Sequence, residues 1–206
     1  MLGSDRYSWP AAFRLDRQVV PRLPDDGIFL EVGANDGFSQ SNTYRLERFE
    51  GWKGILIEPH PKLARRAARW RPASVVLNSA CISDDRPDAY IDLVDIDLMS
   101  VSLGLQQSNE EKRRLDRAIE GATTFRVPAA TISTLIDRSG LGRPTFMSVD
   151  VEGAEHELLA GLDLDRHTPD YLLIETGDIE RVEKALQGHL KRVEQMSKHD
   201  FFFERC

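Results

Sequence analysis

The sequence has few of the residues that would tie a chain to an oxidising compartment, a metal centre or a membrane. Only two cysteines occur among 206 residues, Cys81 and Cys206, and they match no metal-binding spacing and form no disulfide framework. No run of about 18 apolar residues could span a bilayer, and the first residues contain no apolar signal core. We therefore expect a soluble protein of the reducing cytoplasm, without a membrane partner.

The chain also lacks an excess of positive charge. Lysine and arginine number 27 against 34 aspartates and glutamates, which gives a formal net charge of −7. An acidic surface repels phosphate backbones, so we expect no nucleic-acid partner. Hydrophobic residues make up 41% of the chain, which favours one folded domain over a disordered chain.

Strand-like and helix-like segments alternate along most of the chain. Apolar runs typical of buried strands lie at 28–32, 54–58, 75–77, 90–94, 146–149 and 171–175. Helical patterns lie at 39–50, 59–70, 131–139, 153–160 and 179–190. This alternation predicts an α/β fold with a doubly wound, mostly parallel sheet covered by helices on both faces.

The two ends of the chain depart from this alternation. The C-terminal residues have the pattern of two strands with a tight turn near Ser197 and Lys198, and so short a turn requires an antiparallel pair. Residues 1–27 are expected to form an N-terminal arm, and residues 28–206 a single domain. The charged stretch 99–127 interrupts the alternation and predicts either a lid over a ligand site or a solvated surface helix.

The stretch FLEVGANDGF, residues 29–38, ends the first expected strand. Ligands of doubly wound sheets bind at the carboxyl ends of strands, and Gly33 and Gly37 would let the backbone approach one closely. The pattern differs from the dinucleotide fingerprint G-x-G-x-x-G, because Asn35 has a side chain and Glu31 places a carboxylate in the strand end. That carboxylate is awkward for a diphosphate and suits an ammonium group; capping of backbone amides is the alternative, and the glycines together with Glu58 favour ligand binding.

A second acid, Glu58, closes the second expected strand, about 20 residues after Gly37. An acid at this distance accepts hydrogen bonds from ribose hydroxyls. The ligand that fits best therefore carries a ribose and an amino acid and lacks a pyrophosphate. S-adenosylmethionine (SAM) has these features.

Three segments, GANDGFSQSNTYRLERFEGWKGILIEPHPKL, NSACISD and SVDVEGAEHELLAGL, together resemble the FkbM family of SAM-dependent methyltransferases. The resemblance extends from about residue 28 to the end of the chain. It implies a Rossmann-like class I methyltransferase fold and SAM as the methyl donor. It also implies O-methylation of a small hydroxylated acceptor, often a sugar or a polyketide.

The resemblance assigns cofactor-binding positions to residues at the strand ends. They are Glu31, Gly33, Ala34, Asn35 and Gly37 for the methionine part, Glu58 and Pro59 for the ribose, Ala80, Cys81 and Ile82 for the adenine, and Asp150 facing the methyl group.

Methyl transfer to a hydroxyl requires alignment of the acceptor and a base that takes its proton. Asp150 ends an apolar strand and is the first candidate for this base. Glu152 and His156 follow as catalytic candidates, although an acidic helix start would explain Glu152 and a plain surface position would explain His156. No metal is predicted; a divalent cation, if one were bound, would take Asp150 and Glu175 as ligands at neighbouring strand ends.

Two other functions remain compatible with the pattern. A nicotinamide-dependent oxidoreductase is disfavoured by Asn35 and Glu31 in the glycine segment. A methyltransferase-like protein that binds SAM or a partner without turnover would keep the cofactor residues and be insensitive to loss of Asp150. The sequence leaves the acceptor and the oligomeric state open.

Overall fold

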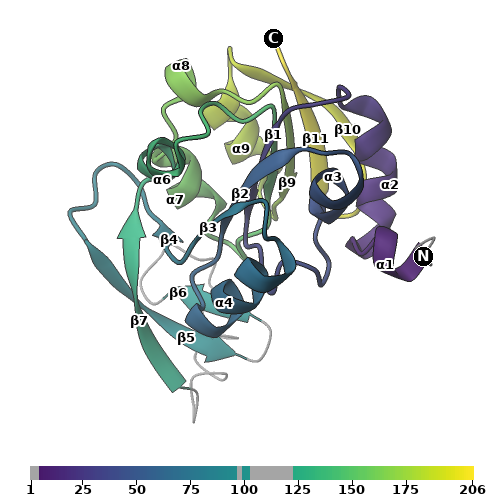
Figure 1. Cartoon of the computed structure of the whole chain (residues 1–206). Helices are drawn as coiled ribbons and strands as arrows, with labels where there is room; N and C mark the ends of the chain where they lie inside the picture. The colour runs from purple at the N-terminus through teal and green to yellow at the C-terminus, as the bar shows by residue number, and fades with distance from the viewer. Residues whose placement is uncertain (1–4, 97–98, 103–122) are drawn as a thin grey trace.

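A seven-stranded sheet forms the centre of the protein (Figure 1), which is described by a computed structural model for residues 5–96, 99–102 and 123–206. The order of the strands is β10-β11-β9-β8-β1-β2-β3. Their bounds are β1 Ile28–Val32, β2 Lys53–Ile57, β3 Val75–Leu77, β8 Phe146–Val149, β9 Tyr171–Glu175, β10 Leu190–Gln195 and β11 Asp200–Arg205.

The pairing of the strands confirms the predicted fold class. β1 pairs in parallel with β2 and β8, β2 with β3, and β8 with β9. β11 lies antiparallel between β9 and β10, as the short turn at 197–198 requires. The strand order reverses between β1 and β8, so the carboxyl ends of these two strands flank the point where ligands bind in doubly wound sheets.

Helices cover both faces of this sheet. Their bounds are α1 Asp5–Ser8, α2 Leu15–Val19, α3 Tyr44–Phe49, α4 Pro61–Trp70, α6 Ile132–Ser139, α7 Glu155–Ala160, α8 Leu164–His167 and α9 Ile179–Leu186, with short 3-10 turns at Ala12–Arg14 and Val20–Arg22. None of the helices in these described ranges is long and apolar enough to cross a bilayer.

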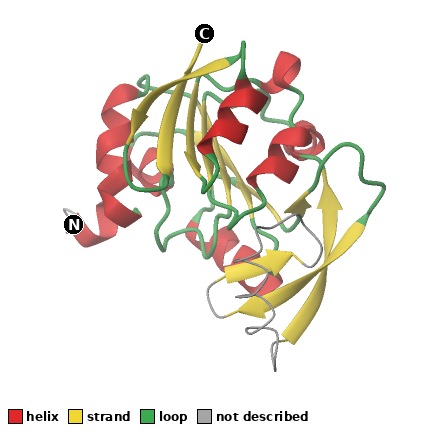
Figure 2. Ribbon diagram, turned by 180° about the vertical axis from the view of Figure 1, so that it is seen from behind, coloured by secondary structure: helices red, strands yellow, loops and turns green. Residues whose placement is uncertain are grey.

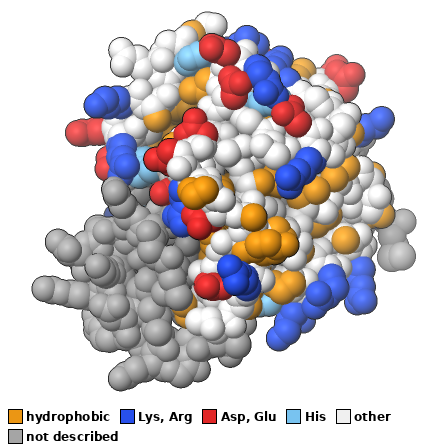
Figure 3. Space-filling model, turned by 90° about the vertical axis from the view of Figure 1, so that its left-hand side faces the viewer, with side chains coloured by type: hydrophobic (Ala, Val, Ile, Leu, Met, Phe, Trp, Pro, Cys, Tyr) orange, Lys and Arg blue, Asp and Glu red, His pale blue; other side chains and the backbone are white. Residues whose placement is uncertain are grey.

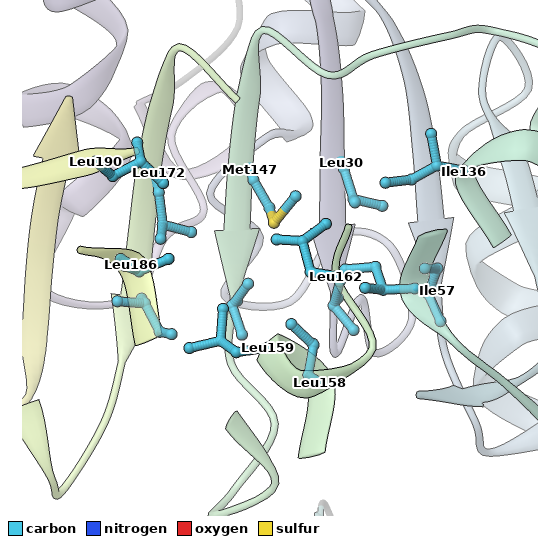
Figure 4. Close-up of a cluster of buried hydrophobic side chains, with 14 of the residues drawn as sticks. Leu30, Ile57, Ile136, Met147, Leu158, Leu159, Leu162, Leu172, Leu186 and Leu190 are labelled. Atoms are coloured by element: carbon cyan, nitrogen blue, oxygen red, sulfur yellow. The ribbon is translucent and has the colours of Figure 1, made fainter. Parts of the chain in front are cut away.

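Two apolar clusters hold the helices to the sheet, because successive strand side chains point to opposite faces. On one face, Leu30, Met147 and Leu172 from the strands pack with residues of α6, α7 and α9 (Figure 4). On the other face, Phe29 and Phe146 pack with residues of α2, α3 and α4. The N-terminal arm therefore contributes α2 to this second layer.

A second, four-stranded sheet lies beside the main one, and the two are seen as separate groups of strands in Figure 2. Its order is β4-β7-β5-β6, with β4 Ala80–Cys81, β5 Tyr90–Ile96, β6 Met99–Ser102 and β7 Thr123–Ala130. The strand expected at 90–94 exists, but it pairs antiparallel with β6 and β7 rather than joining the main sheet. The lid expected at 99–127 falls mostly outside the described residues, and its two ends are β6 and the start of β7.

Candidate functional site

A cavity of about 620 Å³ lies at the carboxyl ends of β1, β2 and β8, a volume typical of small-molecule sites. The loop after β1, the start of α4, the segment after β8 and strand β5 of the second sheet all contribute to its wall. Among the residues expected to bind a cofactor or act in catalysis, those that line it are Gly33, Asn35, Glu58, Pro59, Ala80, Cys81, Asp150 and Glu152. The cavity therefore coincides with the reversal of strand order.

Gly33 allows the ends of β1 and β8 to approach each other closely. Its φ is +81°, and a Cβ atom at this position would lie 1.8 Å from the carbonyl oxygen of Asp150. No larger side chain fits both the conformation and the space. The glycine thus fixes the backbone of the loop against the residue that follows β8.

Glu58 joins the two loops that follow β1 and β2. Its Oε2 accepts a hydrogen bond from the N–H of Asn35 at 2.8 Å, and its Oε1 accepts one from the N–H of His60 at 2.7 Å. Burial raises the pKa of this carboxyl to about 7, although the two hydrogen bonds act in the opposite direction. Each oxygen keeps capacity for a further donor from the cavity.

Asp150 brings an unusual carboxyl group to the opposite side of the cavity. Burial raises its pKa to about 8, and the negative charges of Glu175, Glu152, Asp200 and Glu155 contribute in the same direction. No hydrogen bond from the described residues reaches its carboxylate. A carboxyl with these properties is a stronger base than an ordinary aspartate.

The second sheet supplies an apolar wall through its strands β4 and β5. Ile91 and Leu93 from β5 line the cavity together with Ala80 and Cys81, and β4 is held by its parallel pairing with β7. Burial raises the pKa of the Cys81 thiol to about 12, so it stays neutral. Ile91 and Leu93 were not anticipated, because the strands that pair with β5 are separated from it by stretches that show no strand pattern.

Glu31, which was expected to face a ligand, is not among the residues that line the cavity. Its carboxylate accepts hydrogen bonds from the hydroxyls of Ser41 and Thr43 and from the N–H of Asn42, each at 2.8 Å. The fully buried Arg71 also donates to it at 3.4 Å. Glu31 therefore fixes the segment before α3, and this capture explains why the helix expected from residue 39 begins only at Tyr44.

Three further expected cofactor residues also lie outside the lining. A Cβ atom at Gly37 would lie 2.8 Å from Cα of Ala67, so this glycine allows the loop to pack against α4. Ala34 is 2% exposed and belongs to the core on the same face. Ile82 is 3% exposed and packs with Val127 in the core of the second sheet.

His156 and Glu175 lie away from the lining as well. α7 packs against α9, and the pKa of His156 is lowered by burial and by the charge of Arg181 from α9, with Asp178 acting in the opposite direction. Glu175 ends β9, where burial and the charge of Asp200 are the main causes that raise its pKa. Across the described ranges, no group of three or more His, Cys, Asp or Glu side chains is arranged to hold a metal ion.

Comparison with known protein families identifies the family of this chain. The profile of the family described as "Methyltransferase FkbM domain" matches residues 31–206. The chain belongs to this family. The match confirms the resemblance found in the sequence, the class I methyltransferase fold and SAM as the cofactor of this FkbM methyltransferase.

Solved structures give weaker likenesses. A TehB-like SAM-dependent methyltransferase from Corynebacterium glutamicum is 10% identical with a TM-score of 0.48, over 93% of this chain and 87% of that one. M. capricolum TrmK in complex with S-adenosyl-homocysteine is 10% identical with a TM-score of 0.48, over 95% and 67%. A SAM-dependent methyltransferase from Aquifex aeolicus is 14% identical with a TM-score of 0.45, over 98% and 93%. No curated protein matches, and likenesses at these scores carry no argument about the acceptor.

Several lining residues of this FkbM methyltransferase were missed in the sequence. They include Asp36, Ser39 and Gln40 in the loop after β1, and Leu63 and Arg66 on α4. Leu63 and Arg66 are three residues apart on α4, which starts at Pro61, so helical spacing could have placed them on one face.

Proposed function

We propose that this FkbM methyltransferase transfers the methyl group of SAM to a hydroxyl oxygen of a small acceptor, with Asp150 as the general base. The observation that carries the proposal is that Glu58 and Asp150 line one cavity. Glu58 offers acceptors for ribose hydroxyls, and Asp150 offers a base with a pKa of about 8. The proposed cofactor site and the proposed proton acceptor therefore share one cavity.

The lining residues fit SAM. The free acceptor capacity of Glu58 suits the two hydroxyls of a ribose, and Gly33 lines the same cavity at the end of β1, where the methionine part would lie. Pro59, Ala80 and Cys81, with Ile91 from the second sheet, would border the adenine. When bound, SAM supplies a methyl group on a positively charged sulfur.

Asp150 would hold the acceptor hydroxyl and take its proton. Its raised pKa supports this role, because proton transfer is most efficient when the pKa of the base lies near the working pH. Glu152 lines the same part of the cavity, and its pKa is raised by burial. We assign it to positioning the acceptor. His156 is not part of the proposed machinery, since it lies on the α9 side of α7.

The charges around Asp150 support an acceptor without phosphate groups. Glu152, Glu155, Glu175 and Asp200 all raise the pKa of Asp150, so a negative potential surrounds the reacting oxygen. A polynucleotide backbone would be repelled there. The face of the molecule in Figure 3 carries acidic and basic side chains together, with basic ones prevailing only at its lower right. A neutral polyhydroxylated molecule or a cationic one fits this environment best.

The first experiment is calorimetric titration with SAM and S-adenosylhomocysteine, beside Glu58→Ala. We expect binding that weakens in the variant by about 1–3 kcal/mol, since unpaired ribose hydroxyls would remain buried. NADH should give no heat. Absence of SAM binding would contradict the proposal at its first step.

The second experiment supplies SAM with a labelled methyl group to a pool of small hydroxylated metabolites and, separately, to total RNA. We expect label in the small-molecule pool, about a hundredfold less with Asp150→Asn, and little change with Asp165→Asn as the control, because Asp165 is exposed and does not line the cavity. Label in RNA alone would refute the acceptor class. SAM binding with no transfer to either pool would indicate a protein that binds SAM without turnover.

A further inference from the structure

Among the described residues that line the cavity, Arg66 is the only positively charged one. The acidic groups of the described lining are the carboxyls of Asp36, Glu58, Asp150 and Glu152. We propose that the guanidinium group of Arg66 binds the carboxylate of the methionine part of SAM. The proposal rests on SAM occupying this cavity, and it assigns a cofactor-binding role to a residue that neither the sequence pattern nor the family match identifies.

The N–H groups of residues 33–39, in the loop after β1, are not free to hold that carboxylate. In many phosphate-binding loops, unpaired N–H groups hold the anion. Here the N–H groups of residues 33–39 all donate within the protein, to the carbonyl oxygens of Ile57 and Ala34, the side chains of Asn35 and Asp36, and Glu58.

The start of α3 is engaged in the same way. The N–H groups of Thr43 and Tyr44 donate to the hydroxyl oxygen of Ser41 at 3.3 and 3.0 Å, and that of Asn42 donates to Glu31. Since the N–H groups of residues 33–39 and 42–44 are engaged, a side chain with free donors is the better partner for an anion on this side of the cavity.

Arg66 meets this requirement. It lies on α4, exposed on the side of the helix opposite the buried Ala64 and Ala67, and no described residue forms an ion pair or hydrogen bond with its guanidinium. The carboxylate is the single anionic group of SAM, whereas the ammonium and sulfonium groups are cationic. The acidic lining suits the two cations, and the planar fork of an arginine suits the carboxylate.

Decarboxylated SAM isolates this interaction, because it keeps the sulfonium, the ammonium and the nucleoside and lacks only the carboxylate. We would titrate the wild type, Arg66→Met and Arg66→Lys with SAM and with decarboxylated SAM by calorimetry. Arg65→Met is the matched control, since Arg65 is exposed on the same helix and does not line the cavity. Both positions tolerate methionine as a good helix former.

We expect Arg66→Met to weaken SAM binding about tenfold, the effect of losing a charge-assisted pair, and to leave decarboxylated SAM within about twofold. The affinity of Arg66→Lys for SAM should lie between those of the wild type and Arg66→Met. Arg65→Met should change the affinity for neither ligand.

Equal weakening of both ligands by Arg66→Met, or the same effect from Arg65→Met, would overturn the proposal. The proposal would also be overturned if the Arg66→Met variant bound SAM normally and only its KM for the acceptor were raised. If the wild type binds SAM, and Glu58→Ala weakens this binding while Arg66→Met leaves it unchanged, only the assignment of Arg66 fails. If the wild type binds no SAM, the assignment and the proposed function fail together.

Discussion

The raised pKa of Asp150 makes a quantitative prediction about the stability of the protein without cofactor. A pKa of about 8 in the folded state, against 3.8 for an ordinary aspartate, means that the folded protein binds this proton more tightly than the unfolded chain. Between these two pH values the free energy of unfolding must therefore fall as the pH rises, and above about pH 8 the loss is complete. Asp150→Asn removes this ionisation, so the variant should not lose free energy of unfolding in this way as the pH rises.

The size of the effect follows from about 1.4 kcal/mol per pH unit. At pH 5 the ionisation of Asp150 costs roughly 2 kcal/mol, and at pH 8.5 roughly 5 kcal/mol. We expect the free energy of unfolding of Asp150→Asn, minus that of the wild type, to grow by about 3 to 4 kcal/mol between pH 5 and pH 8.5. The constant difference between an amide and a carboxylic acid cancels in this comparison.

Urea unfolding at pH 5, 6, 7 and 8.5, followed by circular dichroism without SAM, measures this difference directly. Asp170→Asn is the matched control, because hydrogen bonding to Arg143 is the main cause that lowers the pKa of Asp170. Stability from a lowered pKa is lost only as the pH falls towards the acid range, so this control should show a flat difference from pH 5 to 8.5. A flat difference for Asp150→Asn as well would refute the burial and acid clustering that we assign to it.

Three further predictions concern the site. Below pH 7 the affinity of the wild type for SAM should fall by up to about tenfold per pH unit, because only the ionised Glu58 accepts both ribose hydroxyls. The affinity of Glu58→Gln should fall less steeply. Titration at pH 5.5, 6.5 and 7.5 tests this, and an equal pH dependence of the two affinities would contradict it. Gly33→Ala should lower the free energy of unfolding by about 2 kcal/mol or more and impair SAM binding. Gly51→Ala should lower it by only about 1 kcal/mol, because Gly51 has a similar φ of +77° but no atom within 4 Å of the added Cβ. Equal losses in urea unfolding would show that the contact with Asp150 is unimportant. His156→Gln should keep methyl transfer within about threefold of the wild type, and a hundredfold loss in the labelled-methyl assay would restore it as the base.

The elements whose neighbours are close in sequence were predictable. Residues 28–32 form β1 with the expected bounds, because a short apolar run between turn residues is buried on both faces whatever surrounds it. The helix after Glu58 was also expected, since a proline at its first position suits a helix start. The helix expected from residue 39 was wrong at its start, because Glu31 and Arg71, from two separate elements, hold residues 41–43 in a loop.

The site was predicted in part for the same reason. Gly33, Asn35 and Glu58 sit at strand ends, and a parallel sheet brings its strand ends to one edge, so their place on the cavity followed from the strand pattern. Ala34, Gly37 and Ile82 were expected there by position alone, and their side chains or backbones instead pack into the core. Which of two neighbouring residues faces a cavity depends on how a loop packs, and no local pattern fixes this.

The sequence by itself determined the alternation of strands and helices, the place of the glycine segment and of Glu58, and membership of the FkbM family. Only the tertiary structure decided that Glu31 pairs with Arg71, that β5 of a second sheet walls the cavity and that Arg66 is the one cation in the described part of its lining. It also decided the pKa of Asp150, because that value depends on burial and on the distances to acids carried by separate strands and loops. Electrostatic energy depends on separation in space and on exclusion of water, and a chain acquires both only when it folds.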